Sequence, residues 1–254
     1  MTLTGTPGGP DIPRAQDELF AAGRSAREKY QALVVGRPGW AALVAHELVT
    51  LASQALPGAA GLVLRRTLYP LLLGACGRNV VFGQNVVLRH PHRIRIGDNV
   101  VIDDNCLLDA KGDTNEGIRI GSGVFIGRNT ILSCKNGDIV LQDEASIGFN
   151  CEVFSASRVE IGARTLMAAY AYVIGGDHRP DGSDRPVLEQ PRSSAGVRIG
   201  SGAWLGAGVK ILDGADVGEA AIIGAGAVVR SPVPPRAVAV GVPARVVRTR
   251  GEAE

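Results

Sequence analysis

Aromatic residues are scarce in this chain of 254 residues. Phenylalanine, tryptophan and tyrosine together make up 4% of it, whereas 34 residues are glycine. A globular core usually contains many large rings, so the core here must be filled by aliphatic side chains that pack in a repeated way. The length allows one large domain or two small ones.

An excess of charge of one sign is also missing. The formal net charge is +2 and no block of like charge occurs, which gives no reason to expect a nucleic-acid partner. The first residues, MTLTGTPGGPDIP, contain neither the basic start nor the apolar run of a secretory signal. We therefore expect a cytoplasmic protein.

The four cysteines do not form a Cys-x-x-Cys pair, which argues against a zinc ribbon or a thioredoxin-type site. They are Cys76, Cys106, Cys134 and Cys151. Most of them fall at interior positions of the repeat described next. We interpret them as small apolar fillers in a protein from a reducing compartment.

The chain does contain a six-residue repeat, which begins at Cys76. Written in sixes, the sequence gives seven triplets, for example IGDNVV IDDNCL LDAKGD from Ile96. The first position is nearly always Ile, Leu or Val, and the fifth is mostly small. A short strand with an inward first residue and a small residue at each corner predicts a triangular all-β solenoid.

The insertions in this repeat share one position. Later triplets begin at residues 96, 120, 141, 161, 199 and 217, and every residue beyond three hexads falls after the third hexad. Loops inserted at one corner stack along one edge of a solenoid, where sites are commonly built. The largest is the loop 175–198 between the fifth and sixth coils, and His178 lies at its start.

The run from Ile174 to Arg248 carries a group of specific motifs. It contains Asp177-His178, Trp204, LGAGVKILDG, IIGAGAVV, Pro234-Pro235 and GVPARVV. In these motifs the chain resembles the hexapeptide-repeat acetyltransferases, in particular the sugar and polysaccharide O-acetyltransferases of the maltose/galactoside and colanic-acid types. The resemblance implies a left-handed parallel β-helix of about seven coils that assembles as a homotrimer.

The resemblance also implies a mechanism. His178 would deprotonate an acceptor hydroxyl, which attacks the thioester of acetyl-CoA, while backbone N–H groups stabilise the oxyanion. The carboxylate that orients His178 stays open between Asp177, Glu152, Asp184 and Glu189.

The cofactor residues follow from the same resemblance. Trp204 would flank the pantetheine arm of acetyl-CoA, although a corner aromatic packed under the long loop is the alternative. Arg230 and Arg245 would contact the phosphates, against the alternative of solvated surface arginines. The backbone groups expected to meet the arm are those of Gly206, Ala207, Ala225 and Gly226.

Candidate acceptor residues lie on the coil before the histidine. Small-sugar relatives place an Asn and an Asp there, whereas this chain has Gly148 and Ala156 at the matching positions. Asn150 and Glu152 are the nearby polar candidates. The departure argues against a galactoside- or maltose-type acceptor.

A zinc site of the γ-carbonic anhydrase type would need three histidines around one ion. His90 and His92 belong to the first coil and His178 to the fifth, which places them roughly 20 Å apart at the strand spacing of a sheet. Zinc ligands lie about 2 Å from the metal, so we expect no metal.

Residues 1–75 show helical spacing instead of hexads. We expect a helical segment that caps the open end of the solenoid. The alternative is a peripheral membrane foot formed by residues 40–75. The domains predicted from the sequence are therefore 1–75, the solenoid 76–234 and a tail 235–254.

The sequence thus predicts an enzyme that transfers acetyl from acetyl-CoA to a sugar hydroxyl of a polysaccharide or its precursor. The alternatives are an N-acetyltransferase acting on an amino sugar or nucleotide-linked amino sugar, and a solenoid scaffold without catalytic activity.

Overall fold

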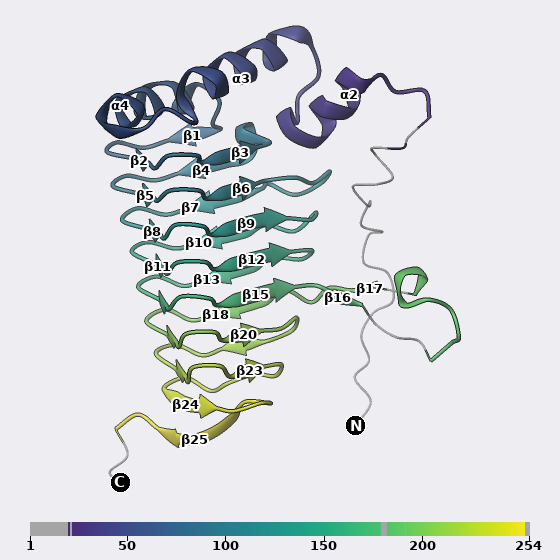
Figure 1. Cartoon of the computed structure of the whole chain (residues 1–254). Coiled ribbons are helices and arrows are strands. Elements are labelled where there is room, and N and C mark those ends of the chain that lie inside the picture. The colour runs from purple at the N-terminus through teal and green to yellow at the C-terminus, as the bar shows by residue number, and fades with distance from the viewer. Residues whose placement is uncertain (1–19, 21, 179–181, 191, 252–254) are drawn as a thin grey trace.

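The chain forms a tall stack of β-coils with helices across one end (Figure 1). A computed structural model describes residues 20, 22–178, 182–190 and 192–251. At Asp177 and His178 it describes the backbone. The strands of each coil pair in parallel with those of the coils above and below, so the molecule is the predicted parallel β-solenoid of about seven coils.

Three sheets run along the stack, which we call sheets A, B and C in the order in which each coil visits them. Sheet A contains β1 (Ala75–Cys76), β4 (Ile94–Ile96), β7 (Ile118–Ile120), β10 (Ile139–Leu141), β13 (Val159–Ile161), β18 (Val197–Ile199) and β21 (Asp216–Val217). Sheet B contains β2 (Val81–Phe82), β5 (Val101–Ile102), β8 (Phe125–Ile126), β11 (Ser146–Ile147), β14 (Leu166–Met167), β19 (Trp204–Leu205), β22 (Ile222–Ile223), β24 (Ala237–Val240) and β25 (Arg245–Thr249). Sheet C contains β3 (Val87–Arg89), β6 (Leu107–Asp109), β9 (Ile131–Cys134), β12 (Glu152–Ser155), β15 (Tyr172–Gly175), β20 (Lys210–Ile211) and β23 (Val228–Val229).

The first residue of each hexad fills the interior, as predicted. Ile102, Ile126 and Leu205 of sheet B have no exposed surface, and the other two sheets contribute matching rows. Cys106, Cys134 and Cys151 are buried in the same interior, where desolvation raises the pKa of their thiols. The aliphatic column therefore replaces the aromatic core that the composition excluded.

The corners use a residue that the sequence prediction did not consider. The residue before the small fifth position has a positive φ in most coils, and it is often asparagine, as at Asn85 (55°) and Asn105 (59°). Asparagine tolerates this left-handed conformation better than most side chains do. Its amide also bonds the asparagine of the next coil, since Asn85 Nδ2 donates to Asn105 Oδ1 at 3.2 Å.

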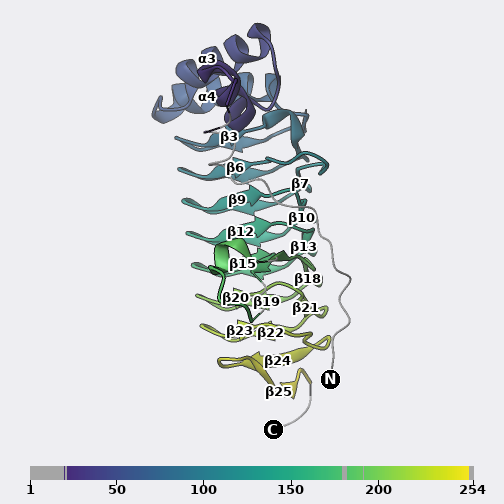
Figure 2. The same cartoon turned by 90° about the vertical axis from the view of Figure 1, so that its right-hand side faces the viewer.

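The loops stack at the corner from sheet C to sheet A, which confirms the position predicted for the insertions. Figure 1 shows them along one edge, and the longest one leaves the solenoid after β15 (Figure 2). Its two arms pair in antiparallel fashion as β16 (Asp177–His178) and β17 (Arg192–Ser193). A short 3-10 turn, η4 (Val187–Glu189), lies within the loop.

The helical segment covers the first coil, as predicted for a cap. It consists of α2 (Ala26–Tyr30), the π-helical turn η1 (Gln31–Val35), α3 (Trp40–Ser53), α4 (Gly58–Leu68) and the 3-10 turn η2 (Tyr69–Leu71). A second 3-10 turn, η3 (Pro91–Arg93), follows β3. Buried Arg65 ties the cap to the solenoid because its guanidinium donates to the carbonyls of Phe82, Ser53 and Leu56 at 2.7–3.0 Å.

The solenoid pattern continues beyond residue 234. Val238 and Ala239 of β24 pair in parallel with Ile222 and Ile223, which adds a strand to sheet B, and β25 then folds back on β24 in antiparallel fashion. The division of the chain at residues 234 and 235 stays a prediction.

Candidate functional site

The corner between sheets B and C brings four of the predicted cofactor residues together. The N–H of Gly226 donates to the carbonyl of Ala207 at 2.8 Å. A side chain added at Gly206 would lie 2.5 Å from the nitrogen of Ala225, so only glycine allows the two coils to stack this closely. The two GAG segments of the sequence, residues 206–208 and 224–226, therefore form one continuous strip of backbone. We call it the cofactor strip, after the role predicted for it.

Two N–H groups in this strip have no acceptor within the described structure. Those of Ala207 and Ala225 point from exposed positions and donate to no described carbonyl or side chain. At the same corner of the first coil, the N–H of Gln84 is capped by the Asp104 carboxylate at 2.6 Å. Alanine has no side chain to do this, so the sequence leaves two donors available for the carbonyl groups of a ligand.

Trp204 lies beside this strip on the outer face of sheet B. It is 49% exposed, and its register neighbours are Leu166 in the coil above and Ile222 in the coil below. An exposed indole between two aliphatic side chains offers a flat apolar surface. The exposed half of the ring leaves room for a ligand.

Arg245 lies at the lower end of the same corner region, and Arg230 lies at the far end of the neighbouring strand β23. The chain around Arg245 is held next to β23, because Ala244 donates to the carbonyl of Val228 and Val228 donates to that of Gly241, at 2.8 and 3.0 Å. Arg230 follows two residues after Val228, and both arginines are exposed. Arg245 Nη1 donates to the carbonyl of Ala244 at 3.1 Å, and the remaining donors of the two exposed guanidinium groups can contact an anionic group at the surface.

His178 belongs to a different corner of the same chain. Its backbone pairs with Arg192 in the β16–β17 hairpin, where the long loop leaves the solenoid. Strand β15 separates this corner from the one that holds Ala207, and its four extended residues alone span about 13 Å. The structure does not bring the histidine and the cofactor strip together within one chain.

The four candidate carboxylates lie at different places around the loop. Asp177 precedes His178 in β16, and its side chain lies outside the described part of the structure. Glu152 lies opposite Tyr172 in sheet C. Tyr172 comes six residues before His178, which corresponds to roughly 20 Å where the chain is extended. Asp184 and Glu189 are exposed on the loop.

The residues considered for the acceptor site also lie apart from one another. Asn150 forms a corner of the fourth coil, with φ 55°, and its Oδ1 accepts a hydrogen bond from Asn129 Nδ2 at 3.0 Å. This asparagine is part of a corner ladder. Ala156, in contrast, packs against Gly176 at the root of the long loop, where a Cβ on the glycine would lie 2.5 Å from the alanine methyl.

A group of side chains that the sequence prediction missed lies on the outer face of sheet C. The rings of Phe154 and Tyr172 are 5.8 Å apart, and the Lys135 ammonium lies 5.3 Å from the centre of the Phe154 ring. Phe154 lies in β12 and Tyr172 in β15, and β15 is the strand that leads to His178. The signal in the sequence was a ring at an outward hexad position in a chain with few rings.

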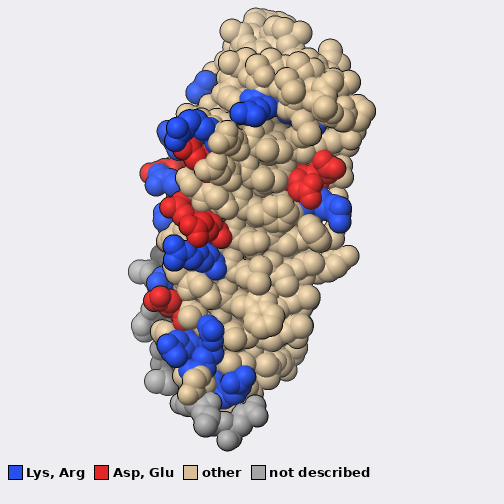
Figure 3. Space-filling model, turned by 90° about the vertical axis from the view of Figure 1, so that its left-hand side faces the viewer, with Lys and Arg blue, Asp and Glu red and all other residues tan. Residues whose placement is uncertain are grey.

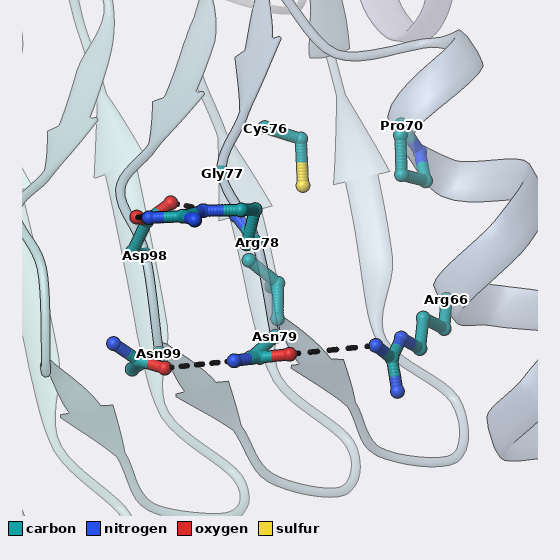
Figure 4. Close-up of a pocket in the computed structure, with 9 residues that line it drawn as sticks. Arg66, Pro70, Cys76, Gly77, Arg78, Asn79, Asp98 and Asn99 are labelled. Carbon is teal, nitrogen blue, oxygen red and sulfur yellow. Dashed lines mark hydrogen bonds and ion pairs between the residues drawn. The ribbon is translucent and has the colours of Figure 1, made fainter.

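A pocket lies at the opposite end, between α4 and the first two coils (Figure 4). Arg78 is paired with Asp98 at 2.9 Å, and Arg66 contacts Asn79 Oδ1 at 3.5 Å. Asn79 in turn donates to Asn99. These polar groups satisfy one another, and the pocket is far along the stack from the cofactor strip.

The histidines of the first coil hold the cap in place. His90 Nε2 lies 2.9 Å from the Ala32 carbonyl, and its Nδ1 lies 3.3 Å from Asp109. Four strand spacings of sheet C separate β3 from β15, about 19 Å. Among the residues that the structure describes, no three His, Cys, Asp or Glu side chains come close enough to hold a metal ion.

Comparisons with known proteins agree with the repeat and the fold. Residues 196–231 match the family model described as "Bacterial transferase hexapeptide (six repeats)". Residues 196–231 are therefore similar to the hexapeptide repeats of bacterial transferases, in agreement with the resemblance found in the sequence. The matched stretch contains Trp204 and both GAG segments.

A curated relative is the probable acetyltransferase Rv3034c of Mycobacterium tuberculosis, which is 34% identical over 133 residues. The match covers 52% of this chain and 44% of the relative, so the chain spans less than half of that protein's length.

Two solved structures show the same fold. The N-acyltransferase AntD from Bacillus cereus, in complex with dTDP and 3-hydroxybutyryl-CoA, has a TM-score of 0.53 at 18% identity and covers 78% of this chain and 90% of its own. A point mutant of the same enzyme, in complex with dTDP-4-amino-4,6-dideoxyglucose and coenzyme A, has a TM-score of 0.51 at 18% identity and covers 71% and 85%.

Proposed function

We propose that the protein is an acyltransferase that moves an acetyl group from acetyl-CoA to a hydroxyl group of a sugar, in a polysaccharide or its precursor. The observation that carries the proposal is the pair of exposed N–H groups at Ala207 and Ala225, next to Trp204. Amide donors beside an apolar ring match the pantetheine arm, which alternates amide carbonyls with short apolar segments.

The remaining cofactor contacts follow from the same geometry. Arg230 and Arg245 are exposed beside β23 and would bind the phosphates of CoA through their guanidinium groups. Gly206 lets the two coils of the strip stack, because a side chain there would collide with the next coil, and Gly226 adopts the left-handed conformation at φ 68°.

In the proposed reaction His178 takes the proton of the acceptor hydroxyl as that oxygen attacks the thioester carbonyl. The tetrahedral oxyanion then collapses, the C–S bond breaks, and His178 returns the proton to the sulfur of CoA. General-base catalysis of this kind contributes about 10²–10⁴-fold. Asp177, Glu152, Asp184 and Glu189 are the candidates for orienting the ring, and Asn150 is a candidate acceptor contact.

We propose a homotrimer as the active form. Within one chain the root of the long loop and the cofactor strip lie at opposite ends of β15, so a neighbouring subunit has to complete the site. Sheet B supports such an assembly because its outward row contains no charged residue from β2 to β24, and Arg248 of β25 follows opposite Val238. In register order the row is Val81, Val101, Phe125, Ser146, Leu166, Trp204, Ile222 and Val238.

Figure 3 shows the side on which Figure 1 places β2, β5 and β8, and the middle of this side is largely uncharged. The outward row of sheet A contrasts with it, since it includes Arg95, Arg119, Glu160, Arg198 and Asp216. A face that is apolar over many coils on an otherwise charged prism favours contact with a second copy.

The second candidate function is N-acetylation of an amino sugar or a nucleotide-linked amino sugar. The complex of the AntD mutant contains an amino sugar nucleotide, and a general base with the same cofactor strip would serve an amine as well. The place of action we propose is the cytoplasm, with peripheral membrane contact through residues 40–75.

The test combines binding with product analysis. Calorimetry should detect CoA binding, and acetyl transfer to neutral sugars, amino sugars and short glycans should release free CoA thiol. A product that alkali cleaves is an ester and supports the O-acetyltransferase, whereas an alkali-stable amide supports the N-acetyltransferase. A folded protein that does not bind CoA would leave the scaffold as the better description.

A further inference from the structure

The helical cap turns an uncharged surface away from the solenoid. Its exposed large apolar side chains include Trp40, Val44, Leu48 and Leu51 on α3, with Leu62 and Val63 on α4. Spacings of three and four residues place the α3 side chains on one side of the helix. The opposite side carries His46 and Val49, which are buried against the solenoid. We call these six exposed residues the apolar end face.

The end face points along the long axis of the molecule. Figure 1 shows α3 and α4 lying across the top of the stack, with the first coil directly below them. Copies that pack side by side through sheet B would leave this end uncovered. In an assembly with its axis parallel to the solenoid, every end face would point in the same direction.

The charges around the end face are mostly positive. Described residues from 20 to 75 that are not buried include five basic and two acidic side chains, namely Arg24, Arg27, Lys29, Arg37 and Arg66 against Glu28 and Glu47, whereas Arg65 is buried. The guanidinium of Arg27 lies 4.7 Å above the Trp40 ring. On the side shown in Figure 3, the helical end is largely uncharged and Lys and Arg side chains lie just below it.

The acidic group nearest to this face is engaged with the protein itself. Glu47 Oε1 accepts a hydrogen bond from the Tyr30 hydroxyl at 2.6 Å and lies 3.2 Å from His46 Nδ1. These contacts hold the carboxylate toward Tyr30, the last residue of α2, and the exposed basic side chains set the sign of the surface.

We propose that the apolar end face docks the protein on an anionic lipid bilayer. Aliphatic side chains would enter the interface between headgroups and acyl chains, Trp40 would lie at the headgroup level, and the arginines would meet anionic headgroups. No helix within the described residues is long and apolar enough to cross a membrane, and the 14 residues of α3 span about 21 Å. Docking is therefore peripheral, and it does not depend on the proposed acetyl transfer.

Co-sedimentation of the full chain with vesicles tests the docking. Vesicles with about 30% phosphatidylserine should pull the protein down at low salt, whereas pure phosphatidylcholine vesicles should bind it at least about tenfold more weakly. High salt should weaken the anionic binding by a similar factor because exposed charges are screened. Equal binding to both vesicle types, or none to either, would overturn the proposal.

A matched pair of double variants locates the contact. Leu48→Gln with Leu51→Gln should lower vesicle affinity at least about tenfold, since each leucine loses the gain from burial. Val246→Gln with Val247→Gln also replaces two exposed aliphatic side chains by glutamine, at the opposite end of the molecule. This variant should not alter vesicle binding. Light scattering of the first variant distinguishes lipid docking from contact with a second copy of the chain. A change in oligomeric state would show that the end face binds a second copy.

Tryptophan fluorescence gives a readout that does not depend on the leucine variants. The chain has two tryptophans, so Trp204→Phe leaves Trp40 as the reporter. Its emission should shift to the blue when anionic vesicles are added, and an unchanged spectrum at saturating lipid would refute the docking.

Discussion

The N–H of Gly226 donates to the carbonyl of Ala207 at 2.8 Å, so the two corners that we propose as the cofactor site lie directly one above the other. This bond uses the carbonyl of Ala207 and leaves its N–H group available. The N–H of Ala225 likewise donates to no group within the described structure. A ligand that lies along this corner therefore meets donors one coil apart, about 4.8 Å.

Capping one of these donors should weaken cofactor binding. Ala225→Asp places a carboxylate where Asp104 stands relative to Gln84 in the first coils. We expect the carboxylate to accept the N–H of Ala207 and to repel the phosphates of CoA. Calorimetry should show at least about a tenfold loss of CoA affinity.

The control for this variant is Arg128→Asp, which makes the same corner change four coils away from Ala225. It should leave CoA affinity within about twofold. Equal losses in both variants would show that the effect comes from distortion of the solenoid and not from the donor.

Removing the predicted base should abolish transfer. His178→Ala should lower turnover by about 10²–10⁴-fold while CoA affinity and oligomeric state stay the same, because the residue lies in the hairpin outside the aliphatic core. Steady-state kinetics with a thiol probe measure this change. His92→Gln on the first coil is the matched control, and more than a tenth of wild-type turnover in His178→Ala would exclude the assignment.

The stability of the cap should depend on pH through His92. Burial, helped by the charges of Arg37 and Arg93, lowers the pKa of His92 to about 4 from 6.5. The unfolded chain therefore takes up a proton near pH 6.5 that the folded chain does not take up until about pH 4, so stability falls as the pH drops through this window.

Thermal unfolding between about pH 4 and 7.5 checks the contribution of His92. The wild-type melting temperature should decrease toward the acid end of this range, and His92→Gln should show a smaller decrease because it has no proton to gain. Parallel curves for the two proteins would contradict the prediction.

Loss of the buried guanidinium should detach the cap. Arg65→Met leaves the carbonyls of Phe82, Ser53 and Leu56 without their donors, and each buried unsatisfied group costs about 1–3 kcal/mol. We expect a loss of at least about 3 kcal/mol in denaturant unfolding. Arg66→Met changes the exposed neighbour and should cost no more than about 0.5 kcal/mol.

The sequence predicted the solenoid, the corner of the loops and the cap because each depends on a pattern that one chain carries within itself. A hexad with an inward Ile or Leu determines its own orientation, as at Ile102 and Ile126. The corner conformation was missed, since only the φ values showed that Asn85 and Asn105 make the turns. The aromatic group around Phe154 was missed because it forms between coils.

The pairing of His178 with a carboxylate could not be predicted for a related reason. The loop that carries it is not part of the repeat, so no periodicity relates Asp184 or Glu189 to the histidine. The separation of His178 from Ala207 was equally hidden, because it depends on which end of a strand each residue occupies. Spacing along a chain does not show which subunit completes a site.

The stacking of every insertion at one corner has a consequence for how such a chain can change. A residue added between sheets C and A lengthens a loop without shifting the register of any strand, as the hairpin at β16 and β17 shows. An insertion at the corner between sheets B and C would displace Ala207 from Gly226 and break the strip. For the proposed transfer, new acceptors can therefore be accommodated on one edge of the prism while the proposed donor side is inherited unchanged.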